Sequence, residues 1–151
     1  MSHPSFTLRR YAAADEDAAI ELWRRTWQIA YPKINFLARI DWWRARWRNE
    51  LVPTAIITVA ERGGAMLGFV TVDPKSGYLD QLVVAPEQWG SRLAATLIAE
   101  AKRCAPVGLD LLVNQDNARA IRFYEKHGFA VTGADTSPLS GAPLHRMSWR
   151  P

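Results

Sequence analysis

The chain has 151 residues, the size of one domain with a single core, and we expect one domain over residues 1–151. Its composition, 48% apolar and 23% charged, is typical of a globular protein and excludes a disordered chain. No apolar run approaches the roughly 20 residues that span a bilayer, and residues 1–6 lack the pattern of a secretory signal. The single cysteine, Cys104, excludes both a disulfide framework and a cysteine metal cluster. We therefore expect a cytoplasmic protein with no membrane or metal partner.

The net charge of +4 comes from fifteen arginines and four lysines spread along the chain. A nucleic-acid surface combines a basic face with stacking aromatics, and residues 42–48, Trp-Trp-Arg-Ala-Arg-Trp-Arg, are the nearest candidate. On a helix, however, the apolar residues of this region form one stripe and leave the arginines largely outside it. The stripe consists of Phe36, Ile40, Trp43, Trp47 and Leu51. We therefore favour a core or pocket wall over nucleic-acid binding.

The first half of the chain predicts a strand, two helices and three more strands. Acidic residues at 15–17, directly after Ala14, favour a helix start, and Pro32 ends that helix. The helix that carries the apolar stripe described above follows, and it is expected to end at Pro53. The β-branched and alternating segments after it are typical of antiparallel strands joined by the glycine-containing turns 62–65 and 73–77. The expected strands are residues 6–11, 55–60, 66–72 and 78–84.

The second half alternates helices with strands. Ser91 is expected to cap a helix running to about Cys104, and a second amphipathic helix is expected from Asp116 to about His127. Gly128 then has the sequence form of a left-handed helix cap. The expected strands are residues 107–113, 129–132 and 144–149, with residues 133–143 as the last connection. The pattern predicts an α+β fold, a mixed and mostly antiparallel sheet of about six to seven strands flanked by about four helices.

Asn117 and Tyr124 are seven residues apart on the second amphipathic helix, close to two turns, so both project from one face. Beside a cofactor, the asparagine can hydrogen-bond amide groups and the tyrosine hydroxyl can give a proton to a departing thiolate. From spacing alone, a helix-capping asparagine and a core tyrosine explain the same pattern. Spacing therefore leaves both interpretations open.

Residues 111–129 resemble the second acetyl-CoA signature of the GNAT N-acetyltransferase superfamily. They read Leu-Leu-Val-Asn-Gln-Asp-Asn-Ala-Arg-Ala-Ile-Arg-Phe-Tyr-Glu-Lys-His-Gly-Phe. The resemblance implies a GNAT-like acyl-CoA N-acyltransferase fold with acetyl-CoA as cofactor. It also implies that Asn117 contacts the cofactor arm and that Tyr124 is the acid for the coenzyme A thiolate.

Residues 82–94 resemble the other family signature, a strand and a loop that enters a helix and holds the pyrophosphate. Backbone N–H groups at a helix N-terminus suit a phosphate. The family loop usually has Gln or Arg, Gly, and Gly or Ala at three anchor positions, where this chain has Trp89, Arg92 and Ala94. We expect binding to persist, because backbone donors tolerate a side chain where φ stays negative. The implied cofactor-binding residues are Leu82, Val83, Val84, Trp89, Gly90, Ser91, Arg92, Leu93, Ala94, Asn117 and Tyr124.

By the same resemblance, a β-bulge within Leu82–Val84 frees backbone groups for the pantetheine arm. One N–H, for which Val84 is our candidate, polarises the thioester carbonyl. Asp80 lies just upstream, where related enzymes often place the acid that accepts the ammonium proton. A solvated or substrate-pairing Asp80 is an equal alternative, and Glu21 on the first helix is a weaker base candidate.

The acceptor pocket of this family is formed by the first two helices and the last connection. Here these segments contain Trp23, Trp27, Tyr31, Trp42, Trp43 and residues 137–141. Aromatic residues at helical spacing also suit a core. We expect direct acetyl transfer to a small-molecule or peptide amine in a ternary complex, since no nucleophile and base pair is apparent. The alternatives are a non-catalytic acyl-CoA sensor and a nucleic-acid-binding module. A homodimer through the exposed last strand is possible.

Overall fold

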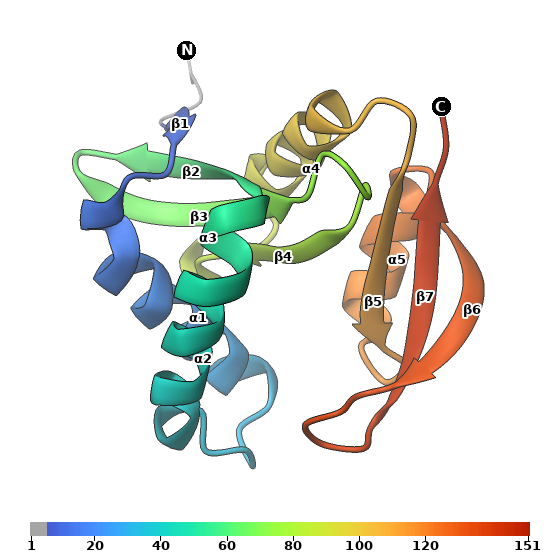
Figure 1. Ribbon diagram of the computed structural model, residues 1–151, viewed down its shortest axis with the longest axis horizontal. Helices are drawn as coiled ribbons and strands as arrows, with labels where there is room; N and C mark the ends of the chain where they lie inside the picture. The colour runs from blue at the N-terminus through green and yellow to red at the C-terminus, as the bar shows by residue number, and fades with distance from the viewer. Residues whose placement is uncertain (1–5) are drawn as a thin grey trace.

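The computed structural model describes residues 6–151 and contains two antiparallel sheets (Figure 1). The first has the strand order β1-β2-β3-β4 and the second has the order β5-β7-β6. The strands are β1 (Thr7–Arg10), β2 (Ile56–Arg62), β3 (Ala65–Val72), β4 (Leu79–Val84), β5 (Leu109–Asn114), β6 (Ala130–Thr136) and β7 (Pro143–Trp149). The α+β prediction is confirmed, and the predicted single sheet is divided into two.

The helices of the described residues are α1 (Glu16–Ala30), α2 (Ile40–Arg46), α3 (Val52–Thr54), α4 (Leu93–Cys104) and α5 (Ala118–Lys126). Short 3-10 turns lie at η1 (Ala13–Asp15), η2 (Leu37–Arg39) and η4 (Pro86–Gln88), and η3 (Trp47–Leu51) is a π-helical segment. None of these helices is long and apolar enough to cross a lipid bilayer.

The predicted helix end at Pro53 is close to the observed one, because α2, η3 and α3 continue without interruption to Thr54 and Ala55 is extended. Proline has no N–H to donate, and its ring disfavours regular α-helical pairing with the preceding turn. The chain widens there into a π-helical turn, in which the Val52 N–H reaches the Trp47 carbonyl five residues back. With this continuous segment counted as one, the described residues contain four helices, as predicted.

The two faces of the first sheet are covered by different helices. One hydrophobic cluster joins residues of α1 and α2 to the face that bears Phe69 and Val83. A second cluster joins α4 to the opposite face, which bears Val70 and Val84. Alternation along a strand requires this division, because successive side chains point to opposite faces. Helices therefore pack against both faces of β4. One edge of β4 pairs with β3, and its other edge has no partner in the first sheet.

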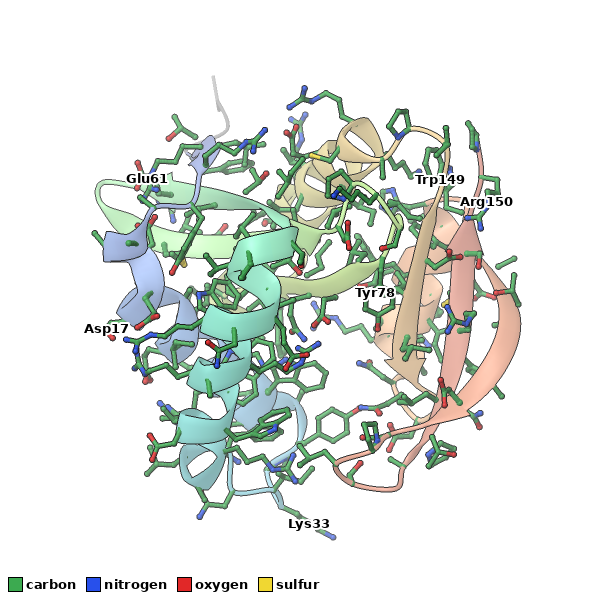
Figure 2. All side chains as sticks on the ribbon, in the orientation of Figure 1. Asp17, Lys33, Glu61, Tyr78, Trp149 and Arg150 are labelled. Carbon is green, nitrogen blue, oxygen red and sulfur yellow. The ribbon has the colours of Figure 1, made fainter. Side chains whose placement is uncertain are left out.

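The two sheets meet at a single isolated parallel bridge between Tyr78 and Asp110. The Asp110 N–H donates to the Gly77 carbonyl at 2.9 Å. Beyond this point β4 and β5 diverge (Figure 1), and Figure 2 shows Tyr78 between the first sheet and the second. The splayed strands leave the edge of β4 without a β5 partner along most of its length.

The β-bulge lies at Asp80 and not within Leu82–Val84 as predicted. The pairing register passes from Thr71 with Gln81 to Val72 with Leu79, which leaves Asp80 as the extra residue. The buried Thr71 hydroxyl accepts the Gln81 N–H at 3.0 Å and so replaces a carbonyl of the ladder. The Asp80 carboxylate accepts from Arg46 of α2 and from the Gln81 amide, so the bulge places Asp80 on the face that α2 covers.

Gly77 lies where the two sheets join, and we expect its replacement to destabilise the fold. Gly77 has φ +77°, and a β-carbon there would lie 2.5 Å from the Gly108 carbonyl oxygen. Gly141 has a similar φ of +73° with no atom within 4 Å of a β-carbon, so it is a matched control. Gly141→Ala should lower the free energy of unfolding by about 1 kcal/mol from the left-handed backbone alone. Gly77→Ala should lower it by about 1–3 kcal/mol more, because of the clash.

Urea unfolding followed by tryptophan fluorescence measures both values. Equal losses in the two variants would contradict a tightly packed junction at Gly77.

Candidate active site

A cavity of about 310 Å³ lies between the edge of β4, α1 and α5. Residues from α1, the edge of β4, the loop before α4, and α5 contribute to its wall. They are Thr26, Trp27, Ala30, Leu82, Val83, Val84, Trp89, Ala94, Asn117, Arg119, Ala120, Phe123 and Tyr124. The structure thus brings together Asn117, Tyr124, the three predicted β4 residues, Trp89 and Ala94. The predicted loop residues Gly90, Ser91, Arg92 and Leu93 do not line this cavity.

The edge of β4 presents backbone groups to this cavity. The Ala85 N–H donates to the Leu67 carbonyl of β3 at 2.8 Å. Because backbone groups of an antiparallel strand alternate in direction, Val83 also faces β3, whereas Leu82 and Val84 face the open edge. The Val84 carbonyl is used by the Trp89 indole N–H at 2.9 Å. The Leu82 and Val84 N–H groups therefore point to the side on which a ligand arm can add to the sheet.

Asn117 is the N-cap residue of α5. It is compatible with both roles that the sequence left open, helix capping and contact with a cofactor. Its side-chain oxygen accepts the Ala120 N–H at 3.2 Å and caps the helix. Its amide nitrogen is not used by this cap, and the residue lines the cavity. Asn117 can therefore hold the helix start with its oxygen and donate to a ligand with its nitrogen.

Tyr124 lies two turns further along α5 and is buried. Burial raises the pKa of its hydroxyl well above the usual value, so the group keeps its proton at neutral pH. The hydroxyl makes no hydrogen bond to residues 6–151, and the ring packs edge-on against Phe129 at 5.4 Å. Gly128, with φ +91°, provides the predicted left-handed cap that turns Phe129 back onto the tyrosine. A protonated phenol whose ring is fixed by packing next to a cavity can act as an acid.

The loop before α4 has the backbone that its phosphate-binding prediction requires. Gly90 has φ +84°, whereas Arg92 has φ −80° and is exposed. The Leu93 N–H donates to the Ser91 hydroxyl at 3.2 Å, and Arg92, not the predicted Ser91, is the N-cap residue. The next two N–H groups, of Ala94 and Ala95, have no carbonyl of a preceding helical turn to bind, whereas the Thr96 N–H donates to the Arg92 carbonyl at 3.0 Å. The arginine neither strains nor covers the loop.

Trp89 connects this loop to α5 across the cavity. The Arg119 guanidinium carbon lies 4.2 Å above the centre of the Trp89 ring, which is cation–π geometry. Sequence reasoning missed Arg119, although it stands two residues after Asn117. Its contact depends on Trp89, thirty residues earlier, and neither residue type alone indicates the pair.

Asp80 lies outside this cavity, in a second one of about 250 Å³ that Arg46, Glu50, Asp73 and Tyr78 also line. Arg46 holds both carboxylate oxygens, with one Nη1–Oδ1 distance of 2.9 Å and a shorter contact between Nη2 and Oδ2. The Asp80 side chain is 11% exposed. The carboxylate is therefore engaged, and it would have to share or leave Arg46 to accept a proton directly.

The predicted aromatic acceptor wall is only partly present. Trp23 and Trp43 stack at 4.7 Å in the core, and Trp42 is half exposed. Trp27 lines the cavity and stacks on Tyr31 at 5.7 Å. Large aromatic side chains are as suited to a core as to a pocket, so helical spacing did not separate the two uses.

Tyr31 ties the end of α1 to the start of α5. Its hydroxyl accepts from the Asn114 amide at 2.9 Å and donates to the Asp116 carboxylate at 3.1 Å.

Residues 137–141 form a turn closed by a hydrogen bond from the Gly141 N–H to the Ser137 carbonyl and line neither cavity. Glu21 is exposed and paired with Arg24.

The family model described as acetyltransferase (GNAT) family matches residues 16–129. The chain belongs to this family. Peptidyl-lysine N-acetyltransferase YjaB of Salmonella typhimurium is 29% identical over 137 residues, which are 90% of this chain and 91% of that protein. Peptidyl-lysine N-acetyltransferase YiaC of Escherichia coli is 27% identical over 145 residues, 94% and 95% of the two chains. The chain is an N-acetyltransferase of the GNAT family that uses acetyl-CoA.

Solved structures share the fold. The PaiA N-acetyltransferase of Thermoplasma acidophilum, in complex with coenzyme A, superposes with a TM-score of 0.80 at 20% identity and covers 98% of this chain and 100% of its own. The solution structure of apo YjaB from Escherichia coli gives a TM-score of 0.78 at 24% identity, with 95% and 97% coverage. At these identities the likeness concerns the fold.

The residues of the cavity fit acetyl-CoA. A pantetheine arm needs backbone partners, and the outward N–H groups of Leu82 and Val84 provide them. A pyrophosphate needs N–H donors, which the start of α4 provides. A β-carbon at Gly90 would meet no atom within 4 Å, so the backbone of the loop is accessible. These groups, with the Asn117 amide, would hold the arm and the phosphates.

We expect Arg92 to assist cofactor binding because its charge lies at the start of α4 and its backbone is unstrained. Arg92→Ala should weaken acetyl-CoA binding about three- to tenfold in calorimetric titration, and should reduce the thermal stabilisation at a given ligand concentration. Arg103→Ala, at the far end of the same helix and paired with Glu100, is the control and should bind as the wild type does. Tighter binding by Arg92→Ala would mean that the arginine obstructs the loop.

Proposed function

We propose that this chain transfers the acetyl group of acetyl-CoA to the side-chain amine of a lysine in a peptide or protein. The two relatives named above act on peptidyl lysine, which supports this acceptor class. The observation that carries the proposal is the cavity in which Asn117 and Tyr124 of α5 face the open edge of β4. A second cavity is lined by three carboxylates, on Glu50, Asp73 and Asp80, and by one guanidinium, and this excess of negative charge favours an approaching cation.

Acetyl-CoA supplies the acetyl group as an activated thioester. The Val84 N–H, directed outward from β4, is proposed to donate to the thioester carbonyl and to stabilise the negative charge that develops on its oxygen. The Leu82 N–H, two residues before Val84 on the same strand, points the same way and is proposed to bind the pantetheine arm of acetyl-CoA. The Asn117 amide nitrogen donates to the same arm from the opposite wall. These donors are fixed by the sheet and by the helix cap before any ligand arrives.

Tyr124 is proposed to give its proton to the departing sulfur. Its burial keeps the phenol neutral until a strong base forms next to it, and a thiolate expelled into a dry cavity is such a base. Asp80 is proposed to take the proton that the acceptor amine loses, through water, because Arg46 already binds both of its oxygens. The amine attacks directly while both substrates are bound.

Tyr124→Phe should lower kcat by about 10²-fold without changing the dissociation constant of acetyl-CoA, because it removes only the proton donor. Coenzyme A release measures turnover, and calorimetry measures binding. Tyr11→Phe is the control, since the Tyr11 hydroxyl accepts from the Trp47 indole and lines neither cavity. Unchanged turnover in Tyr124→Phe would exclude the acid role. Acetyl-CoA binding without transfer to any amine by the wild type would favour a sensor.

Asp80→Asn should lower kcat/KM for the amine by about 10²-fold, because an amide cannot accept the proton. Glu50→Gln is the matched control from the same cavity, since its carboxylate is 65% exposed and lies 3.9 Å from Arg46. It should alter kcat/KM by less than about threefold. Loss of stability in Asp80→Asn with wild-type kinetics would limit Asp80 to its pair with Arg46.

A further inference from the structure

Thr26 lies in the second half of α1 and borders the cofactor cavity together with Trp27 and Ala30. Its hydroxyl oxygen is shielded from solvent and has no hydrogen-bond partner within residues 6–151. Burying a hydroxyl without a partner is unfavourable, and native structures seldom retain one without a reason. This residue therefore needs an explanation that packing does not give.

Other helical threonines of the chain do satisfy their hydroxyls. Thr54 donates to the Glu50 carbonyl at 2.7 Å and Thr96 to the Arg92 carbonyl at 2.9 Å, in each case four residues back. Thr26 has the Leu22 carbonyl at the same spacing and does not bind it. Threonine in a helix uses two χ1 rotamers, and no hydrogen bond holds Thr26 in the observed one. No hydrogen bond would therefore have to be broken for the hydroxyl to turn toward a partner in the cavity.

The other buried polar side-chain atom without a partner in the described chain is the indole nitrogen of Trp43. Trp43 lies within the α1 and α2 core and lines neither cavity. Within residues 6–151, Thr26 thus combines an unpartnered buried polar atom with a position on the wall of the cofactor cavity. This combination points to a ligand, whereas Trp43 is a feature of the core.

The position of Thr26 indicates which ligand it meets. The helix α1 packs on the same face of the first sheet as α2, whereas α4 and the loop that precedes it cover the opposite face. The groups suited to the cofactor, at Trp89, Asn117 and the start of α4, therefore line the other walls. A second substrate that approaches the edge of β4 from the α1 face passes Thr26.

We propose that Thr26 is an acceptor-binding residue, whose hydroxyl accepts a hydrogen bond from the attacking lysine amine and orients the nitrogen lone pair toward the thioester. This inference rests on the function proposed above. A neutral hydroxyl suits this task, because a carboxylate in its place would favour the ammonium form, which has no lone pair for attack. Trp27 and Ala30 beside it give the amine an apolar approach.

The test uses Thr26→Val, which keeps the shape of the side chain and removes the hydroxyl, and Thr26→Ser, which restores the hydroxyl. Thr132→Val makes the same change on β6, where the hydroxyl pairs with Ser148 and lines neither cavity. The probe is Nα-acetyl-lysine amide. Its KM is measured at saturating acetyl-CoA, and its dissociation constant is measured by calorimetry with the protein saturated with coenzyme A, where no transfer occurs.

Thr26→Val should raise both constants for the amine about tenfold, as expected for one lost hydrogen bond, and leave acetyl-CoA binding within about twofold. Its urea midpoint without ligands should equal or exceed that of the wild type, because an unsatisfied hydroxyl is removed. For Thr26→Ser, the KM and the dissociation constant of the amine should stay within about threefold of the wild-type values. Thr132→Val should have the wild-type values.

If Thr26→Val has the same KM and dissociation constant for the amine as the wild type, the inference is overturned. A loss of acetyl-CoA binding as large as the loss for the amine would also overturn it, because the hydroxyl would then serve the cofactor arm. A wild-type protein that binds the amine without transferring acetyl would refute the proposed function, and the calorimetric constant would still test Thr26. A wild-type protein that does not bind the probe would overturn the lysine assignment.

Discussion

The parallel bridge between Tyr78 and Asp110 determines the architecture of the active site, because pairing between the two sheets ends there. A continuous sheet would satisfy the whole β4 edge with β5, and no donor would be left for a ligand. The divergence instead turns the N–H groups of Leu82 and Val84 toward a cavity and brings the α5 side chains to face them. The buried Thr71 hydroxyl, which accepts the Gln81 N–H, sets the bulge next to this branching point.

Local sequence features predicted well the parts of the site that are built within one segment. The cap formed by Asn117, the spacing to Tyr124 and the left-handed Gly128 depend on neighbours within about twelve residues, and all three are found. The bulge was misplaced because its position depends on Thr71, in the preceding strand. The helix ends at Thr54, next to the predicted end at Pro53, whereas the π-helical turn before it was not predicted.

Contacts between distant segments were beyond sequence reasoning. Arg46 and Asp80 are 34 residues apart, and nothing in either neighbourhood indicates that a guanidinium occupies both carboxylate oxygens. The aromatic residues of the first two helices share one pattern, yet Trp43 fills the core and Trp27 borders the cavity. The unpartnered hydroxyl of Thr26 can be recognised only after every neighbour is placed. The sequence thus indicates which chemistry is present, and the tertiary packing decides which groups are free for it.

The hydrogen bonds of Tyr31 have a consequence for the thermodynamics of ligand binding. By joining α1 to Asn114 and Asp116, they fix the spacing of the two walls at the end of the cavity away from the Tyr78 bridge. The conformational entropy lost in holding the walls apart belongs to folding and not to association. A ligand that enters this cavity therefore orders mainly itself, and the enzyme can bind a flexible arm such as pantetheine without a large closure of its own.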